Sequence, residues 1–172
     1  MLIHPWDAAT REEWQGLLAH SDFGQLVTAG HVDGYPVIVP THFVYDGQHV
    51  LLHLARPNPV WQAIDADPHV VLALVADYVY VEAAWNADPG TDPEVGVPTS
   101  YYFAVQLLCR AEVIDDPDEK AAVLARQLGH FEPLGVRMSL GRITRRPARL
   151  FPAISPLNPH MLMRHGSPWT IP

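Results

Sequence analysis

A β-barrel with peripheral helices is the fold class that this 172-residue sequence predicts. Three observations lead to it: about six segments have strand patterns, short turn signals join them, and only three segments have helical periodicity. Hydrophobic residues make up 48% of the chain and charged residues 17%, which is an ordinary globular balance. At this length we expect one domain with a sizeable hydrophobic core.

The first predicted elements are a helix and a strand. Thr10 and Glu13 have the spacing of a capping box, and apolar residues at helical intervals follow them, so we predict a helix over residues 11–20. Residues 23–29 alternate in the manner of a strand, and the glycines within residues 30–34 indicate a turn.

The next segment is a strand pattern that contains prolines. Residues 35–45 are rich in β-branched and aromatic side chains, but Pro36 and Pro40 interrupt them. Proline inside a strand indicates an edge or a bulge, where the backbone can face a ligand instead of a neighbouring strand. Asp46-Gly47 is a two-residue hairpin signal that leads into a further strand at 48–54.

The remaining elements are predicted from apolar runs and the signals at their ends. Asp67-Pro68 ends a helix, Asp116-Pro117 begins another, and the prolines and glycines of residues 85–98 indicate a loop. The elements so delimited are a helix at 59–66, strands at 69–76, 78–83 and 99–114, a helix from 117 that ends within 129–133, and a short strand at 148–151.

Residues 53–61 are the segment with the clearest functional pattern. Asn58 is a good N-cap and Pro59 suits the first helical position, so a helix start is predicted there. A helix start exposes unpaired N–H groups, and with Arg56 two residues upstream it forms a plausible socket for a phosphate. The alternative is that Arg56 is a solvated loop residue and that Asn58-Pro59 only marks the turn.

The net charge of −8 is distributed unevenly along the chain. Residues 1–132 hold all 19 acidic residues and five of the 11 basic ones, which gives them a net charge of −14. Residues 133–172 form a Pro/Arg-rich segment with a net charge of +6, and its charged residues are Arg137, Arg142, Arg145, Arg146, Arg149 and Arg164. Such a segment is either a basic arm for nucleic acid or a C-terminal stretch that packs poorly.

Several classes of protein are disfavoured. No run of about 18 apolar residues occurs, and the N-terminus has no signal-peptide pattern, so we expect a cytoplasmic protein without a membrane span. Cys109 is the only cysteine, which excludes an intrachain disulfide and a CxxC site and favours a small buried hydrophobe. The usual dinucleotide, phosphate-loop, zinc-protease and hydrolase motifs are missing.

Histidines and aromatic residues supply further candidates. His42 and His53 could be cross-strand neighbours that hold a haem or a metal axial position, or they could simply bond to the backbone in a half-buried sheet. Five aromatic side chains could wall a flat ring or belong to the core: Trp61, Trp85, Tyr101, Tyr102 and Phe103.

Four segments, taken together, resemble the PaiB-type FMN-binding family, also called the FMN-binding negative transcriptional regulator family. They occur in the order and at the spacing of that family, within residues 1–131: PTHF at 40–43, HLARPNPVW at 53–61, YVEAAW at 80–85 and VPTSYY at 97–102. The family belongs to the larger pyridoxamine-phosphate-oxidase-like group of split barrels.

This resemblance implies a split barrel of about six antiparallel strands that dimerises and binds FMN at the dimer interface. It implies that Arg56 and the helix start at Asn58 hold the FMN phosphate, and that the backbone at 39–42 and Gln106 contact the ring. The cofactor-binding residues expected on this basis are Val39, Pro40, Thr41, His42, His53, Ala55, Arg56, Asn58, Trp61 and Gln106.

The chain departs from the family pattern at two places. Ser100-Tyr101 stand where the family usually has Trp-Asn, and nothing after Pro133 matches the lysine-containing motif of the family. We therefore divide the chain into a split-barrel domain, residues 1–132, and a divergent Pro/Arg-rich segment, residues 133–172.

Three functions follow as expectations. The first is a flavin-dependent redox protein, such as an FMN-dependent oxidoreductase, or a flavin-linked regulator; no side chain stands out as a catalytic acid or base, and the small-molecule substrate is unspecified. The second is a haem enzyme similar to the piperazate synthases, with haem b and His53 as axial ligand; otherwise no metal site is expected. The third is a DNA-binding transcriptional regulator, although residues 1–132 would repel DNA.

Overall fold

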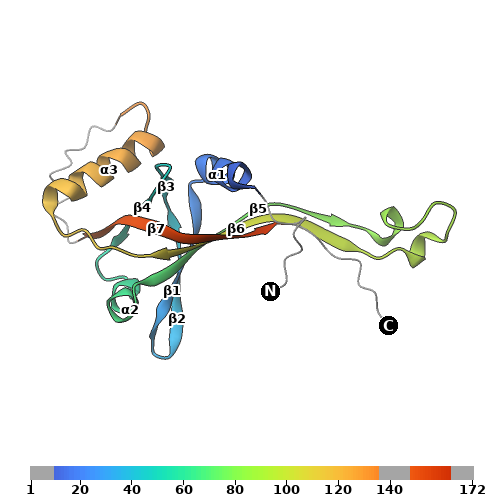
Figure 1. Ribbon diagram of the computed structural model, residues 1–172, viewed down its shortest axis with the longest axis horizontal. Helices are drawn as coiled ribbons and strands as arrows, with labels where there is room; N and C mark the ends of the chain where they lie inside the picture. Colours follow the sequence, from blue (N-terminus) through green and yellow to red (C-terminus); the bar gives the residue numbers. More distant parts are fainter. Residues whose placement is uncertain (1–9, 136–147, 164–172) are drawn as a thin grey trace.

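The protein, described here by a computed structural model for residues 10–135 and 148–163, is a seven-stranded antiparallel sheet with three α-helices (Figure 1). Its elements in chain order are α1 (Arg11–His20), β1 (Phe23–Val32), β2 (Tyr35–His42), β3 (Val44–Tyr45), β4 (Val50–Ala55), α2 (Val60–Ala66), β5 (His69–Val81), β6 (Thr99–Arg110), α3 (Pro117–Phe131) and β7 (Ala148–Met163), with the short 3-10 helices η1 (Ala83–Trp85) and η2 (Pro93–Val95) between β5 and β6.

The strands follow the order β2-β1-β5-β6-β7-β4-β3, and the sheet curves around one apolar core. Large, fully buried side chains come from β1, β4, β5 and β6 and from the residue between β2 and β3: Leu26, Leu52, Leu72, Leu107 and Phe43. Because strands far apart in the order share one core, the sheet encloses it as a split barrel. The predicted fold class, a mainly β barrel with peripheral helices, is confirmed.

The helices cover this barrel in different places. The predicted capping box of α1 is present: Glu13 N–H donates to Thr10 Oγ1 at 3.3 Å, and Thr10 N–H donates to the Glu13 carboxylate at 2.7 Å. Trp14 and Leu18 of α1 are buried in the core. None of the helices in the described part of the chain has the length and apolar character that crossing a lipid bilayer requires.

α3 lies over the outer face of β4. Its buried side chains Val123 and Leu124 pack with Leu51 of β4 and with Ile114, and these four form a small apolar cluster separate from the main core. Gln127 is buried one turn further along the same helix. This arrangement brings the C-terminal half of α3 over the outward-facing residues of β4.

Several strand boundaries differ from the prediction. β1 continues to Val32, through part of the turn predicted at 30–34, and β6 ends at Arg110 and not at residue 114. The segment predicted as one strand at 35–45 is split into β2 and β3 at Phe43, whose side chain is fully buried and whose N–H donates to Asp22 O at 2.9 Å. The segments predicted as separate strands on either side of Asp77 are one strand, β5, with an irregularity in its pairing between Ala76 and Tyr78. Asp77 is the extra residue at this β-bulge, and its φ angle is positive, at 21°.

The predicted two-residue hairpin turn is a longer loop of four residues, Asp46 to His49. Asp46 N–H donates to His49 O at 3.0 Å, and the Asp46 carboxylate accepts hydrogen bonds from the N–H groups of Gln48 and His49. An aspartate that bonds to the backbone two and three residues ahead stabilises such a loop.

β7 is much longer than the strand predicted at 148–151. It runs from Ala148 to Met163, pairs with β4 through its first residues and with β6 through the remainder, and so joins the two parts of the sheet. Part of the Pro/Arg-rich segment 133–172 therefore belongs to the sheet.

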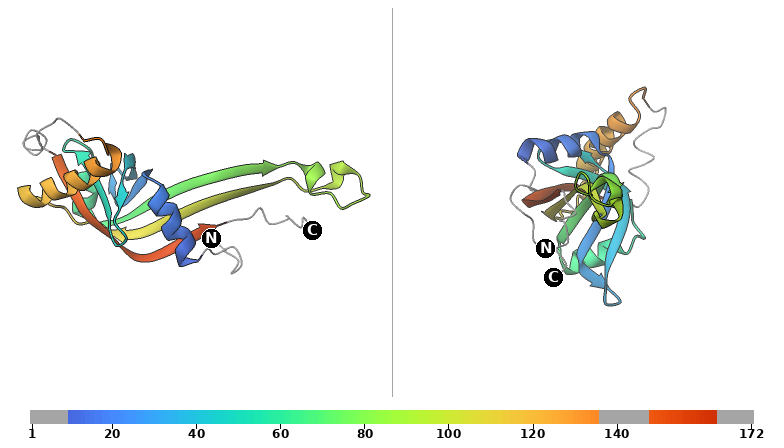
Figure 2. Two further views of the ribbon diagram at one scale, coloured as in Figure 1. Left: turned by 90° about the horizontal axis from the view of Figure 1, so that it is seen from above. Right: turned by 90° about the vertical axis from the view of Figure 1, so that its right-hand side faces the viewer.

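β5 and β6 continue beyond the body of the barrel as a two-stranded arm. We define the arm as residues 76–102, because Phe103 is the last residue of β6 that lies opposite β7, and β1 pairs with β5 only up to Ala73. Figure 2 shows this hairpin extending well away from the other strands, with η1 and η2 at its tip. Three tyrosines, Tyr78, Tyr80 and Tyr102, lie on it as exposed side chains.

Candidate functional site: the Arg56 loop and the outer sheet face

The loop between β4 and α2 is held in place by hydrogen bonds to one carbonyl group. Ala55 O accepts from Asn58 N–H at 3.0 Å and from the indole N–H of Trp61 at 2.9 Å. The predicted start of α2 is one residue too early: the N-cap is Pro59 and not Asn58, and the first helical residue is Val60. The Asn58 side chain still accepts from Val60 N–H at 3.0 Å. Arg56 therefore projects from a loop with a fixed backbone.

Arg56 lines a cavity of about 440 Å³ at this loop. The other lining residues are Pro57, Asn58, Pro59, Trp61, Gln62 and Asp65. Arg56 is exposed, and among the described residues no acidic side chain forms an ion pair with it. Asp65 lies near the other end of α2, roughly 7 Å along the axis from the first helical residue. The cavity thus has a cationic end and an acidic end.

Two further predicted residues, Pro40 and Gln106, share the outer face of the sheet. Pro40 of β2, Gln25 of β1, Ala73 of β5 and Gln106 of β6 lie opposite one another in successive strands, so they form one row. Residues opposite one another in adjacent strands share a face, and Pro40 and Gln25 are exposed, which identifies this as the outer face. β2 is an edge strand, as its prolines predict.

The other residues of β2 that are predicted to contact the cofactor have side chains on both faces of the sheet. His42 is exposed on the outer face, as is Pro40, whereas Thr41 is buried and Val39 packs against the core. Only the backbone of Val39 and Thr41 is therefore available to a ligand on the outer side.

His42 and His53 are not cross-strand neighbours, so the first of the two arrangements predicted for them is wrong. His42 lies opposite Phe23 in β1, and His53 lies opposite Leu150 in β7, because β2 pairs with β1 and not with β4. No group of three or more metal-ligating side chains occurs within residues 10–135 and 148–163. A metal site that joins the two histidines through sheet pairing is therefore not formed.

The two histidines nevertheless contact one face of α3. His53 Nδ1 lies 2.8 Å from Gln127 Oε1, and the centre of the His42 ring lies 5.1 Å from that of Phe131. Gln127 and Phe131 are four residues apart, so they are neighbours on the helix surface. Sequence reasoning overlooked Gln127; the available signal was a polar residue on the buried side of an otherwise amphipathic helix.

The aromatic residues considered as walls for a flat ring lie in three places. Trp61 is buried in the core with 5% of its surface exposed, and Trp85 is exposed near the tip of the arm. Tyr101, Tyr102 and Phe103 line a second cavity of about 500 Å³ at the base of the arm. The other residues of that cavity are Glu13, Asp77, Tyr78 and Val79, and none of them was predicted as a site residue.

Cys109 is a buried side chain of β6, as predicted. Its exposed fraction is 1%, and burial raises the pKa of its thiol to about 12. Because the thiolate is the nucleophilic form, this cysteine has no reactive character at neutral pH.

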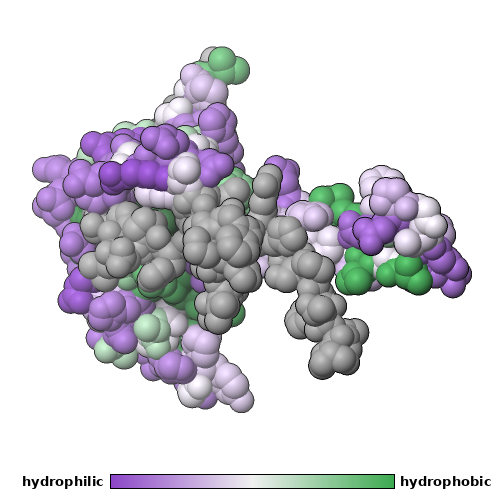
Figure 3. Space-filling model, turned by 45° about the vertical axis from the view of Figure 1, so that its right-hand side comes forward, coloured by the Kyte–Doolittle hydropathy of each residue, from purple (hydrophilic) through white to green (hydrophobic). Residues whose placement is uncertain are grey.

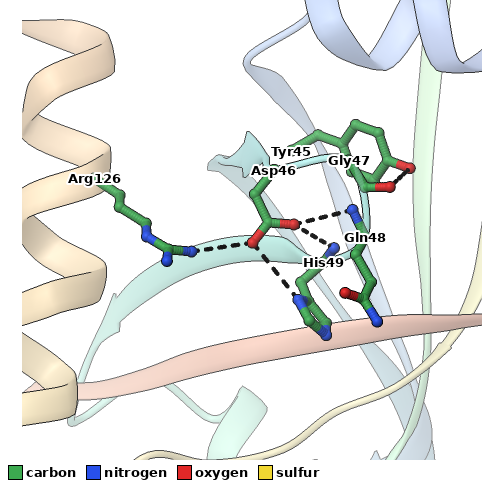
Figure 4. Close-up of polar contacts among 6 residues, drawn as sticks. All are labelled: Tyr45, Asp46, Gly47, Gln48, His49 and Arg126. Atoms are coloured by element: carbon green, nitrogen blue, oxygen red, sulfur yellow. Dashed lines mark hydrogen bonds and ion pairs between the residues drawn. The ribbon is translucent and has the colours of Figure 1, made fainter.

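Asp46 connects the β3–β4 loop to α3. Figure 4 shows its carboxylate between Arg126 and His49, with Oδ2 3.1 Å from Arg126 Nη1 and 3.6 Å from His49 Nδ1. Partial burial raises the pKa of Asp46, but the hydrogen bonds from His49 and Gln48 N–H and the nearby His49 ring outweigh this effect. The pKa of this carboxyl group therefore lies below its usual value of 3.8.

Asp46→Asn is expected to lower the free energy of unfolding at pH 7 by less than about 1 kcal/mol, because the pair is partly exposed. A carboxyl group whose pKa falls on folding stabilises the protein above its unfolded pKa and loses this contribution as the pH falls through its folded pKa. Urea unfolding at pH 7 and pH 3 should show a smaller difference from the wild type at pH 3. Asp33→Asn, at an exposed turn, is the control; an undiminished Asp46→Asn effect at pH 3 would contradict the assignment.

The solved structures that are similar to this chain show the same fold. A FAD and haem binding protein from Mycobacterium smegmatis aligns with a TM-score of 0.70 and 21% sequence identity, over 92% of this chain and 73% of that one. The flavocytochrome Anf3 from Azotobacter vinelandii aligns with a TM-score of 0.68 and 19% identity, over 96% and 74%. The haem storage protein HutZ from Vibrio cholerae aligns with a TM-score of 0.54 and 13% identity, over 89% and 93%.

Comparison by sequence identifies the family. No curated protein matches the chain. The model of one protein family, however, matches residues 1–155, which is most of the chain and extends into β7. The family match supports the flavin-binding split barrel as a whole and FMN as the cofactor that the family description names. The chain belongs to the family described as "Putative FMN-binding domain".

Proposed function

We propose that the protein binds FMN and serves as a flavin-dependent redox protein, with Arg56 as the residue that holds the phosphate. The observation that carries this proposal is the Arg56 cavity: an exposed guanidinium on a fixed loop, without an acidic partner among the described side chains. A guanidinium matches phosphate in charge and hydrogen-bond geometry. α2 has only seven residues, so Arg56 rather than the helix dipole supplies most of the positive charge.

The outer sheet face offers features that suit a flat ring. Pro40 and Ala73 provide an apolar surface, and the amides of Gln25 and Gln106 in the same row can each donate and accept hydrogen bonds. A flavin ring combines apolar area with a polar edge that has donors and acceptors, so these residues fit it. FMN would supply the electron or hydride chemistry, whereas the protein would bind and orient the cofactor.

We favour redox chemistry over direct DNA binding. Residues 1–132 carry a net charge of −14, which repels a polyanion. Of the six arginines that suggested a basic arm, Arg149 lies in β7 and the other five lie outside the described residues. The name of the PaiB-type family suggests regulation, and a flavin-linked regulatory role would use the same cofactor site.

The arm supports a further part of the proposal, which is a homodimer. Exposed apolar side chains lie along it, including Tyr78, Val79, Tyr80 and Trp85, and their exposed fractions range from 52% to 78%. The paired strand segments 76–81 and 99–102 contain only one charged residue, Asp77. Figure 3 shows hydrophobic surface on the arm, which extends beyond the body. An apolar surface of this kind is typical of an interface, and we propose that a second copy of the chain covers it.

Tyr80→Glu is expected to convert the dimer into a monomer, because it would place a charge in the buried interface while leaving the fold of each chain intact. Size-exclusion chromatography with light scattering measures the mass directly. Ala19→Glu, at an exposed position of α1, is the matched control and should leave the dimer unchanged. A wild-type protein that is monomeric at micromolar concentration would contradict the dimer.

One observation favours haem as a second candidate cofactor. His53 is exposed on the outer face of β4, and its Nδ1 is bonded to Gln127, which leaves Nε2 free to act as an iron ligand. The absorption spectrum of the purified protein, before and after titration with FMN or haemin, separates the candidates. Flavin bands support the first function and a Soret band the second; a protein that takes up neither cofactor would overturn both.

A further inference from the structure

Gln127 is a buried polar side chain that connects α3 to two groups of β4. Only 3% of its surface is exposed. Its Nε2 donates to Leu51 O at 3.1 Å, and its Oε1 lies 2.8 Å from His53 Nδ1. The pairing of β4 with β7 shifts in register between Val50 and Leu52, on either side of Leu51. Both ends of the amide therefore have a partner.

The contact with Leu51 determines the orientation of the amide. A carbonyl oxygen is only an acceptor, so the group that faces it at 3.1 Å must be the NH₂ of Gln127. In the flipped orientation two oxygen atoms would face one another, in a buried site where each would lack a donor. Oε1 is thus directed at His53.

The orientation of the amide in turn determines the tautomer of His53. Oε1 is an acceptor, so His53 Nδ1 must carry the proton that is donated to it. In the neutral imidazole, Nε2 then has a free lone pair. Because His53 is exposed, Nε2 is accessible from outside the barrel. An unrestrained neutral histidine in water prefers the opposite tautomer, so the protein imposes this one.

We propose that Gln127 is a positioning residue that keeps His53 in the Nδ1-protonated tautomer and thereby makes His53 Nε2 a preformed ligand for haem iron. In metalloproteins, a ligating histidine commonly donates its second N–H to a fixed acceptor, which sets the ring orientation. The tautomer follows from the contacts of Gln127 alone; its use as an iron ligand rests on the haem candidate described above.

Gln127 is not needed merely to attach α3 to the barrel. Val123 and Leu124 already pack against Leu51 and Ile114, and Arg126 pairs with Asp46 at 3.1 Å. An apolar side chain of similar length would fill the position of Gln127 without disturbing these contacts. What an apolar side chain could not supply is the pair of hydrogen bonds that the amide makes with Leu51 O and with His53.

The tautomer can be tested without any cofactor. Two-dimensional ¹⁵N–¹H spectra of the imidazoles, recorded in mildly alkaline buffer, identify the nitrogen that carries the proton. We expect Nδ1 to be protonated in the wild type and Nε2 in Gln127→Met. Arg126→Met, the adjacent control, should keep the wild-type tautomer. A wild-type His53 with its proton on Nε2, or an unchanged tautomer in Gln127→Met, would overturn the proposal.

Gln127→Leu provides a second variant in case the methionine variant does not fold. Leucine also removes the acceptor for Nδ1 and keeps an apolar side chain at this buried position, so His53 should carry its proton on Nε2; a proton still on Nδ1 there would overturn the proposal. Haemin titration then tests the ligand role: we expect binding to be about 10-fold weaker in Gln127→Met than in the wild type. Equal affinity would overturn the ligand role. A wild type that binds no haemin would overturn haem as a candidate cofactor. The spectra of the imidazoles test the tautomer independently of haemin, so they show which of the two claims has failed.

Discussion

Arg56→Ala is expected to weaken FMN binding by about 1.5–3 kcal/mol, which is the contribution of hydrogen bonds to a charged group. At 1.4 kcal/mol per factor of ten, this corresponds to a loss of roughly 10- to 150-fold in affinity. Arg56 is the one basic residue among those that line its cavity, and no acidic side chain in the described ranges forms an ion pair with it. Quenching of flavin fluorescence during titration measures the dissociation constant.

Arg126→Ala is the matched control for this experiment. Arg126 is also an exposed arginine, but it belongs to α3, pairs with Asp46 and does not line the cavity. It should leave the affinity for FMN unchanged. An Arg56→Ala variant that binds FMN as tightly as the wild type would return Arg56 to the role of a solvated loop residue.

Gly30→Ala is expected to destabilise the fold by about 3 kcal/mol, because β1 and α2 approach each other too closely for a side chain at this position. A Cβ atom on residue 30 would lie 1.8 Å from Ala63 O and 2.7 Å from its carbonyl carbon. Both are backbone atoms, so the helix as a whole would have to move. α2 follows the Arg56 loop directly, and its displacement should also weaken FMN binding. Urea-induced unfolding measures the loss of stability.

Gly16→Ala is the control for the effect of an added methyl group. Gly16 lies in α1, and a Cβ there would have no neighbour within 4 Å. Alanine is the better helix former, so this variant should be as stable as the wild type or more stable by about 0.5–1 kcal/mol. If Gly30→Ala were as stable as Gly16→Ala, the close packing of α2 on β1 would be wrong.

Elements whose signals are local could be predicted from the sequence. The capping box of Thr10 and Glu13 places the start of α1 correctly, and Asn58-Pro59 places the start of α2 to within one residue. The prolines of β2 correctly identify an edge strand. In each case the responsible groups lie within a few residues of one another, so no knowledge of the remaining chain is required.

Features that depend on contacts between distant segments could not be predicted in this way. β7 contains Pro152, Pro156 and Pro159, which disfavour a strand locally, yet it pairs with β4 and β6. The arm is another example, because the pattern of apolar and polar residues in β5 and β6 does not show where their pairing with β1 and β7 stops. Strand pairing depends on residues far apart in the chain, whose proximity no local pattern encodes.

The candidate site shows the same division. The Arg56 loop was identified from consecutive residues, and the structure adds its cavity and its fixed backbone. The relation of His53 to Gln127 spans 74 residues and became visible only when α3 was placed over β4. The same placement explains why His42 and His53 contact one helix although their strands are not paired.

Titration of the wild-type protein with FMN and with riboflavin tests the central claim most directly, because the two ligands share the ring and differ in the phosphate. Recognition of the phosphate by Arg56 predicts that FMN binds more tightly than riboflavin by about 1.5–3 kcal/mol, and that Arg56→Ala removes this difference. Equal affinity for the two ligands in the wild type, or no binding of either, would contradict the account.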